Sequence, residues 1–97
     1  MSVTVILEVT AKPQCIDDLI AWFTGNFNQT RVREGCLDVH MSRSHDDPNH
    51  LALVMHWVER KNYENYLQWR GETGAVEKLT AMAASAPTIR YFDRLDA

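Results

Sequence analysis

The stretch LALVMHWV, residues 51–58, is apolar at every position except His56. A β-strand turns alternate side chains to opposite faces of its sheet, so a strand that is apolar at both sets of positions is covered on both faces. A single layer of helices covers only one face of a sheet. The stretch therefore predicts a sheet with helices on one side and a second covering surface on the other.

The flanking sequence supplies three further strands. Residues 3–9 and 37–42 carry apolar side chains at alternate positions, which is typical of strands. The turn-forming segment SHDDPNH, residues 44–50, joins the second of these to residues 51–58 as a hairpin. The segment TIRYFDRL, residues 88–95, is rich in β-formers and predicts the last strand.

The segments between these strands have the apolar periodicity of helices. Residues 13–33 have apolar residues at helical spacing, and Gly35 lies just beyond, where a left-handed conformation commonly ends a helix. Residues 60–70 predict a second helix that ends at Gly71, and Thr73 is expected to cap a third. The order of elements is that of the ferredoxin-like split βαβ arrangement, an α+β fold with an antiparallel sheet.

The 97 residues are expected to form one domain, residues 1–97. A chain this short buries only about 60–70% of the surface that its unfolded form exposes. Two copies packed sheet against sheet would cover the second apolar face, so we expect a homodimer.

Composition excludes several classes of function. Hydrophobic residues make up 45% and charged residues 24% of the chain, the net charge is -3, and the basic residues are scattered, so we expect no nucleic-acid partner. No basic leader precedes the first apolar run, and no apolar stretch reaches about 18 residues, so we expect a cytoplasmic protein without a membrane partner.

The two cysteines lack CxxC spacing and predict buried free thiols. Without a glycine-rich phosphate loop or an HExxH helix, we expect neither cofactor nor metal.

Three titratable residues of the predicted hairpin share one face of the sheet. A register in which paired residue numbers sum to about 94 would set Asp38 opposite His56, with His40 nearby on the same face. A carboxylate that orients an imidazole makes a workable general base. The alternative is that these histidines are structural or exposed to solvent. The histidines and aspartates of residues 45–50 are explained by turn formation rather than by a metal site.

The segment REGCLDVHMSRSHDDPNHLALVMHWVERKNYENYL, residues 33–67, resembles the antibiotic biosynthesis monooxygenase family. The similarity lies in an E-G-C-L turn, a D-D-P hairpin and the approach to the following helix, carried by Glu34, Gly35, Cys36, Leu37, Asp46, Asp47, Pro48, Trp57 and Arg60. The resemblance implies a dimeric α/β barrel. It also implies a cofactor-independent monooxygenase that acts on a small phenolic or quinol-type aromatic compound with dioxygen.

In such an enzyme the substrate supplies the electrons, because its deprotonated, electron-rich anion reacts with dioxygen directly. The protein must provide a dry pocket, donors that hold the anion, a base and aromatic walls. Trp57 and Tyr63 match the family's pocket tryptophan and tyrosine, whereas Ser42 stands in place of a family histidine. The candidate residues are, as catalytic groups, His56, His40 and Tyr63, and, as substrate-binding groups, Trp57, Tyr66, Trp69 and Asp38.

Other interpretations use the same fold. The four aromatic candidates at this spacing also suit a core or a dimer contact. The haem degraders of the family place an Asn, a Trp and a His where this chain has Ile6, Tyr66 and Val76 or Glu77, so no axial ligand for haem is expected. The chain could instead be a non-catalytic dimeric protein that binds a small metabolite, or an isomerase that transfers protons. Oxygen uptake with quinols separates the first of these from a monooxygenase.

Overall fold

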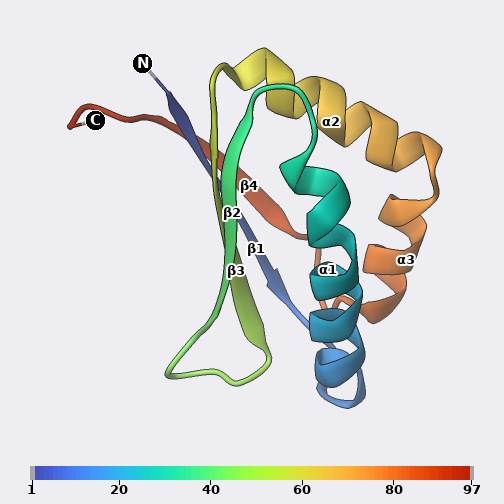
Figure 1. Ribbon diagram of the computed structural model, residues 1–97. Coiled ribbons are helices and arrows are strands. Elements are labelled where there is room, and N and C mark those ends of the chain that lie inside the picture. The colour runs from blue at the N-terminus through green and yellow to red at the C-terminus, as the bar shows by residue number, and fades with distance from the viewer. Residues whose placement is uncertain (1, 97) are drawn as a thin grey trace.

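Four strands form one antiparallel sheet in the order β2-β3-β1-β4, and all the helices lie on one of its faces (Figure 1). The computed structural model describes residues 2–96. Its elements are β1 (Val3–Thr10), the 3-10 helix η1 (Pro13–Cys15), α1 (Ile16–Arg31), β2 (Cys36–Arg43), β3 (His50–Trp57), α2 (Arg60–Glu72), α3 (Ala75–Met82) and β4 (Thr88–Asp93). This architecture confirms the predicted α+β, ferredoxin-like fold.

The core lies between the sheet and the helices, because the strands turn one set of alternate side chains toward them. In the central strand β3 these residues are Leu51, Leu53, Met55 and Trp57, and all are buried. Leu19, Phe23 and Phe27 of α1 pack against them at helical spacing. The apolar periodicity of both elements is therefore satisfied by one shared core.

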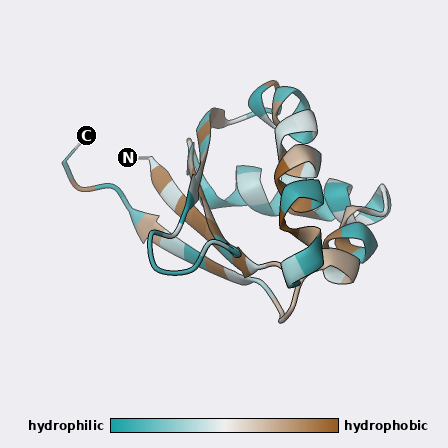
Figure 2. Cartoon of the chain, turned by 90° about the horizontal axis from the view of Figure 1, so that it is seen from below, coloured by the Kyte–Doolittle hydropathy of each residue, from teal (hydrophilic) through white to brown (hydrophobic). Residues whose placement is uncertain are grey.

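The opposite face of the sheet is covered by no element within residues 2–96 (Figure 2). It carries the other alternate set of β3, which is half-buried, and the partly exposed Phe92 of β4. The prediction that helices cover a single face is thus confirmed. A second subunit on the open face remains a prediction.

The hairpin register agrees with the sequence prediction, except at its start. Asp38 pairs with His56 and His40 with Val54, as a sum of 94 requires. A β-bulge between Cys36 and Asp38 leaves Leu37 without a partner, and its side chain is 56% exposed. The expectation that Leu37 continues the buried alternation of β2 was therefore wrong.

The boundaries of the helices differ from prediction at their C-terminal ends. Gly35 has a φ of 85°, as expected for the residue that turns the chain after a helix, but α1 ends at Arg31. Gly71 does not end α2, which continues to Glu72. Thr73 does not cap α3, because its hydroxyl donates backward to the Arg70 carbonyl at 2.9 Å, and the left-handed Gly74 begins the helix instead.

Two further expectations are adjusted. The cysteines are free, as predicted, but each is only half-buried. The last strand ends at Asp93, so Leu95 lies beyond the sheet and is exposed. No helix within residues 2–96 is both long and apolar enough to cross a membrane.

Candidate functional site

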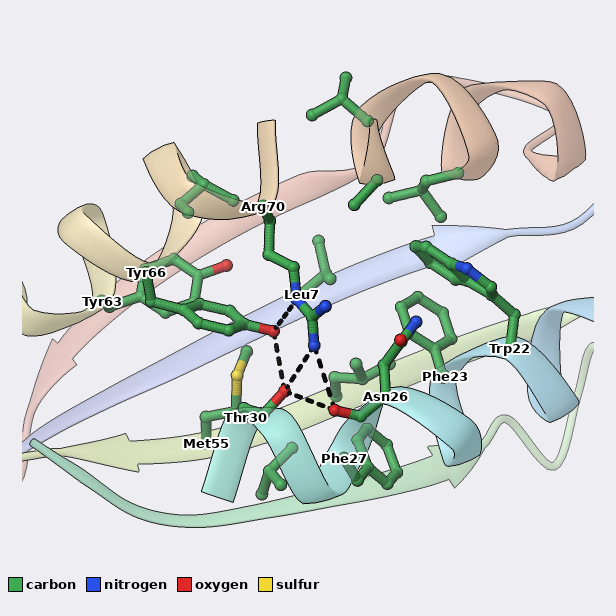
Figure 3. Close-up of a pocket in the computed structure, with 16 residues that line it drawn as sticks. Leu7, Trp22, Phe23, Asn26, Phe27, Thr30, Met55, Tyr63, Tyr66 and Arg70 are labelled. Carbon is green, nitrogen blue, oxygen red and sulfur yellow. Dashed lines mark hydrogen bonds between the residues drawn. The ribbon is translucent and has the colours of Figure 1, made fainter. Parts of the chain in front are cut away.

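A cavity of about 80 Å³ lies between the sheet and the three α-helices (Figure 3). Its floor consists of helix-facing residues of three strands, Leu7, Val39, Leu53 and Met55. Rings from α1 and α2 form its walls, among them Trp22, Phe23, Phe27, Tyr63 and Tyr66. The lining is thus largely apolar and aromatic, which suits a flat organic ring.

One polar cluster interrupts this lining, and it joins α2 to α1. Arg70 Nε donates to the Tyr66 hydroxyl at 2.9 Å, and the Tyr66 and Thr30 hydroxyls share a hydrogen bond of 2.8 Å. Thr30 Oγ1 also donates to the Asn26 carbonyl at 3.3 Å. Either hydroxyl of the central pair can act as the donor, but Thr30 carries a single hydroxyl hydrogen and donates it either to Asn26 or to Tyr66. The Tyr66 hydroxyl can therefore turn its hydrogen toward Thr30 or toward a ligand in the cavity.

Arg70 itself is buried, with 9% of its surface exposed. Its guanidinium points from α2 toward α1 and donates to Gln29 Oε1 at 3.0 Å, to the Asn26 carbonyl at 3.1 Å and to Thr30 Oγ1 at 3.4 Å (Figure 3). It also lies against the Tyr66 and Trp69 rings, 5.3 and 4.8 Å from their centroids. No carboxylate of residues 2–96 forms a salt bridge with it. The positive charge is held by neutral groups only.

Tyr63 lies in the wall of the cavity with 1% of its surface exposed. Burial, and to a smaller extent the neighbouring Tyr91 and Tyr66, raises the pKa of Tyr63 far above its ordinary value of about 10. The hydroxyl therefore keeps its proton at neutral pH. It is suited to donating a hydrogen bond and not to accepting a proton as a base.

The Trp57 ring packs against the rings of Tyr63 and Tyr66 and does not itself line the cavity. Its ring is fully buried and lies 5.6 Å from the Tyr63 centroid and 5.3 Å from the Tyr66 centroid. Its indole Nε1 is buried and has no hydrogen-bond partner within residues 2–96, which costs about 1–3 kcal/mol. Trp69 packs between Tyr66 and Arg33 and also lies outside the lining. Among the aromatic candidates, only Tyr63 and Tyr66 line the cavity.

The structure confirms the expected pairing of Asp38 with His56 but places the pair on the other side of the sheet. Asp38 Oδ1 and His56 Nδ1 are 2.7 Å apart. Because Met55 and Trp57 face the helices, His56 between them points to the open face, and the pairing in the hairpin puts Asp38 and His40 there as well. The sheet thus separates the histidines from the tyrosines, and the two groups do not share one cavity.

The segment 44–50 forms the turn that its composition predicted. Ser44 Oγ accepts hydrogen bonds from the Asp46 and Asp47 amides, and Asp47 Oδ1 accepts one from the Asn49 amide at 2.9 Å. His50 contacts Thr10 Oγ1 at 2.7 Å and Glu8 Oε1 at 2.9 Å. Within residues 2–96 no group of three or more His, Cys, Asp or Glu side chains is placed to hold a metal.

The polar cluster was not predicted, although its members leave a pattern in the sequence. Arg70 lies four residues after Tyr66 and seven after Tyr63, so the three share one face of α2. Thr30 lies three residues after Phe27 and seven after Phe23, on the buried face of α1. Each of the two helices thus carries a polar residue on its otherwise apolar face. This pattern could have revealed the cluster.

A protein-family model described as Antibiotic biosynthesis monooxygenase matches residues 2–78 of the chain. Comparison with curated proteins gives no match.

Solved structures share the fold at low sequence identity. One described as antibiotic biosynthesis monooxygenase is 22% identical, with a TM-score of 0.84, over 96% of this chain and 98% of its own. A protein from Methanosarcina mazei Go1 is 14% identical, with a TM-score of 0.88, over 98% and 94%. Rv0793 from Mycobacterium tuberculosis is 19% identical, with a TM-score of 0.80, over 100% and 98%. At such identities the likeness supports the fold alone.

The raised pKa of Tyr63 predicts how stability changes at alkaline pH. The unfolded chain loses the Tyr63 proton near pH 10, whereas the folded chain retains it, so the free energy of unfolding is unaffected below about pH 10 and falls above it. At pH 11.5 this residue should lower the free energy of unfolding by about 2 kcal/mol. Urea unfolding at pH 8 and pH 11.5 should show a smaller decrease for Tyr63→Phe than for the wild type. An equal decrease in both would contradict the assignment.

Proposed function

The chain belongs to the antibiotic biosynthesis monooxygenase family, and we propose that it is a cofactor-independent monooxygenase acting on a small phenolic or quinol-type aromatic compound. The observation that carries the proposal is the aromatic-lined cavity between sheet and helices, with a single cluster of hydroxyl groups and a cation at its edge. An apolar enclosure with one polar cluster binds a ring and fixes the direction of its oxygen substituent.

The dimensions of the cavity limit the substrate. A volume of about 80 Å³ is small beside the roughly 300–1,000 Å³ of pockets for drug-sized ligands. We therefore propose a substrate with a single six-membered ring in the cavity, and not a polycyclic compound enclosed on all sides.

The proposed reaction needs no electron donor other than the substrate. A phenol and dioxygen give a quinone and water: one oxygen atom enters the ring carbon, the other leaves as water, and the substrate loses the two hydrogens that the water carries away. The Tyr66 hydroxyl can accept a hydrogen bond from the substrate hydroxyl, or donate to the phenolate once the Thr30 hydroxyl turns toward Tyr66. The nearby Arg70 charge favours the phenolate, since it acts in a site that excludes most water.

One observation favours a second candidate, a dimeric protein that binds a small metabolite without transforming it. Among the described residues, those that line the cavity include no carboxylate and no imidazole. A monooxygenase here must therefore transfer the substrate proton to water, with Arg70 stabilising the anion that remains. A binding protein needs no such step.

We also propose that the protein is a homodimer that packs through the open faces of two sheets. Ile6, Ala52 and Val54 form an apolar strip there, and Phe92 extends it to β4. The Asp38–His56 and Glu8–His50 pairs lie on the same face, so each of these carboxylates has a partner within its own subunit. A self-complementary apolar strip is what a two-fold interface requires.

Oxygen uptake with a panel of monocyclic quinols, in buffer freed of metals by a chelator, tests the reaction. We expect turnover by the wild type, and about 10²-fold lower kcat/KM for Tyr66→Phe, which removes the donor to the phenolate. His56→Gln is the matched control and should stay within about threefold of the wild type, since the sheet lies between it and the cavity. Binding without oxygen uptake would favour the metabolite-binding protein. Loss of activity in His56→Gln, and not in Tyr66→Phe, would move the site to the open face.

Light scattering coupled to size exclusion tests the dimer. The wild type should have twice the 11.2 kDa mass of the chain, and Val54→Asp should have the mass of the monomer because it places a charge in the centre of the apolar strip. Val32→Asp is the control, since Val32 is 82% exposed and lies outside the sheet. A wild-type monomer at micromolar concentration would contradict the proposal.

A further inference from the structure

We propose that the ligand of the cavity carries a carboxylate, and that this group binds outside the cavity at Arg70 and Lys78. The inference rests on the proposed function only in that the aromatic ring of the same molecule occupies the cavity. The carboxylate site is a polar hollow of about 180 Å³. It adjoins the cavity, because Trp22, Asn26, Arg70 and Ala75 line both.

The hollow has the composition of an anion site. Its two charged residues, Arg70 and Lys78, are both cations, and its other polar residues, Asn26, Gln29 and Thr73, are neutral. No salt bridge within residues 2–96 involves either cation. The two positive charges therefore act together on whatever enters the hollow.

Arg70 is the stronger of the two determinants, because it is nine-tenths buried and has no counter-ion in the described chain. A buried charge is normally paired, since removal from water costs far more for an ion than for a neutral group. The neutral acceptors around Arg70 satisfy most of its hydrogens without neutralising it. Its Nη1 makes one hydrogen bond, to Gln29 Oε1, and carries two hydrogens, so one N–H remains for a ligand.

The arrangement fits a molecule with an apolar ring at one end and a carboxylate at the other. The ring would rest on the apolar lining of the cavity, and the carboxylate would accept a hydrogen bond from the guanidinium that lies between the two spaces. Lys78 would add a second charge from the rim, where its side chain is exposed. A neutral ring of the same shape would gain only the first of these contacts.

Arg70 also ties α2 to α1, so its replacement alone could act by loosening the fold. The test therefore compares two ligands of nearly equal shape, 2,5-dihydroxybenzoate and 2,5-dihydroxybenzamide, which differ in charge. Calorimetric titration without oxygen gives the ratio of their dissociation constants for each variant. A merely structural role of Arg70 would weaken both ligands and leave this ratio unchanged. Lys78→Gln changes an exposed side chain that lines the hollow, and Lys61→Gln, at an exposed lysine outside the lining, is the control for net charge.

The wild type should bind the benzoate at least about 10-fold more tightly than the benzamide. Lys78→Gln should reduce that ratio about threefold, Arg70→Gln should abolish it, and Lys61→Gln should leave it unchanged. Equal affinity of the wild type for the two compounds would overturn this inference and leave the proposed function intact. An unchanged ratio in Lys78→Gln and in a folded Arg70→Gln would also overturn it. Failure of both compounds to bind would overturn the inference and the proposed cavity together.

Discussion

The alternation of side chains along β3 is the constraint on which the rest of the structure depends. It turns Leu53 and Met55 toward the helices, where they form the floor of the cavity. It turns Val54 and His56 toward the open face, where a second subunit is proposed. Because neighbouring residues cannot face the same way, one strand supplies two surfaces of different use. Binding of a ring and association of subunits are therefore assigned to opposite sides of the same sheet.

The polar cluster is the feature that makes the helix-side cavity more than a defect in packing. A purely apolar core would be filled by side chains, and a buried cation without a carboxylate is costly to keep. Arg70 is held in place by Gln29, the Asn26 carbonyl and two aromatic rings, so its position is fixed before any ligand arrives. Groups that are oriented in advance stabilise a developing anion without reorganising, as the hydrogen-bond donors of oxyanion sites do.

The fold followed from the sequence because its signals are local and periodic. The doubly apolar run 51–58 predicted a sheet with one helical layer, and the register that pairs Asp38 with His56 followed from the hairpin. The prediction for Leu37 was wrong because a bulge interrupts the alternation of side chains between the two faces of the sheet. The alternation of apolar and polar residues in the sequence does not reveal such a bulge. The prediction that His56 and Trp57 line one pocket was inconsistent with the predicted strand, because adjacent residues of a strand face opposite sides of the sheet. The contacts of Arg70 with α1 join residues about 40 positions apart, and helix spacing alone does not show which helices meet.

The position of the ring can be tested most directly with a crystal structure of the protein with 2,5-dihydroxybenzamide, a neutral single-ring quinol, bound in the absence of oxygen. We expect density for the ring between Met55 and the tyrosines of α2, with one hydroxyl within hydrogen-bond distance of the Tyr66 oxygen. Density on the open face of the sheet, beside Asp38 and His56, would contradict it. In that case the pairing of carboxylate and imidazole, and not the Arg70 cluster, would be the functional centre.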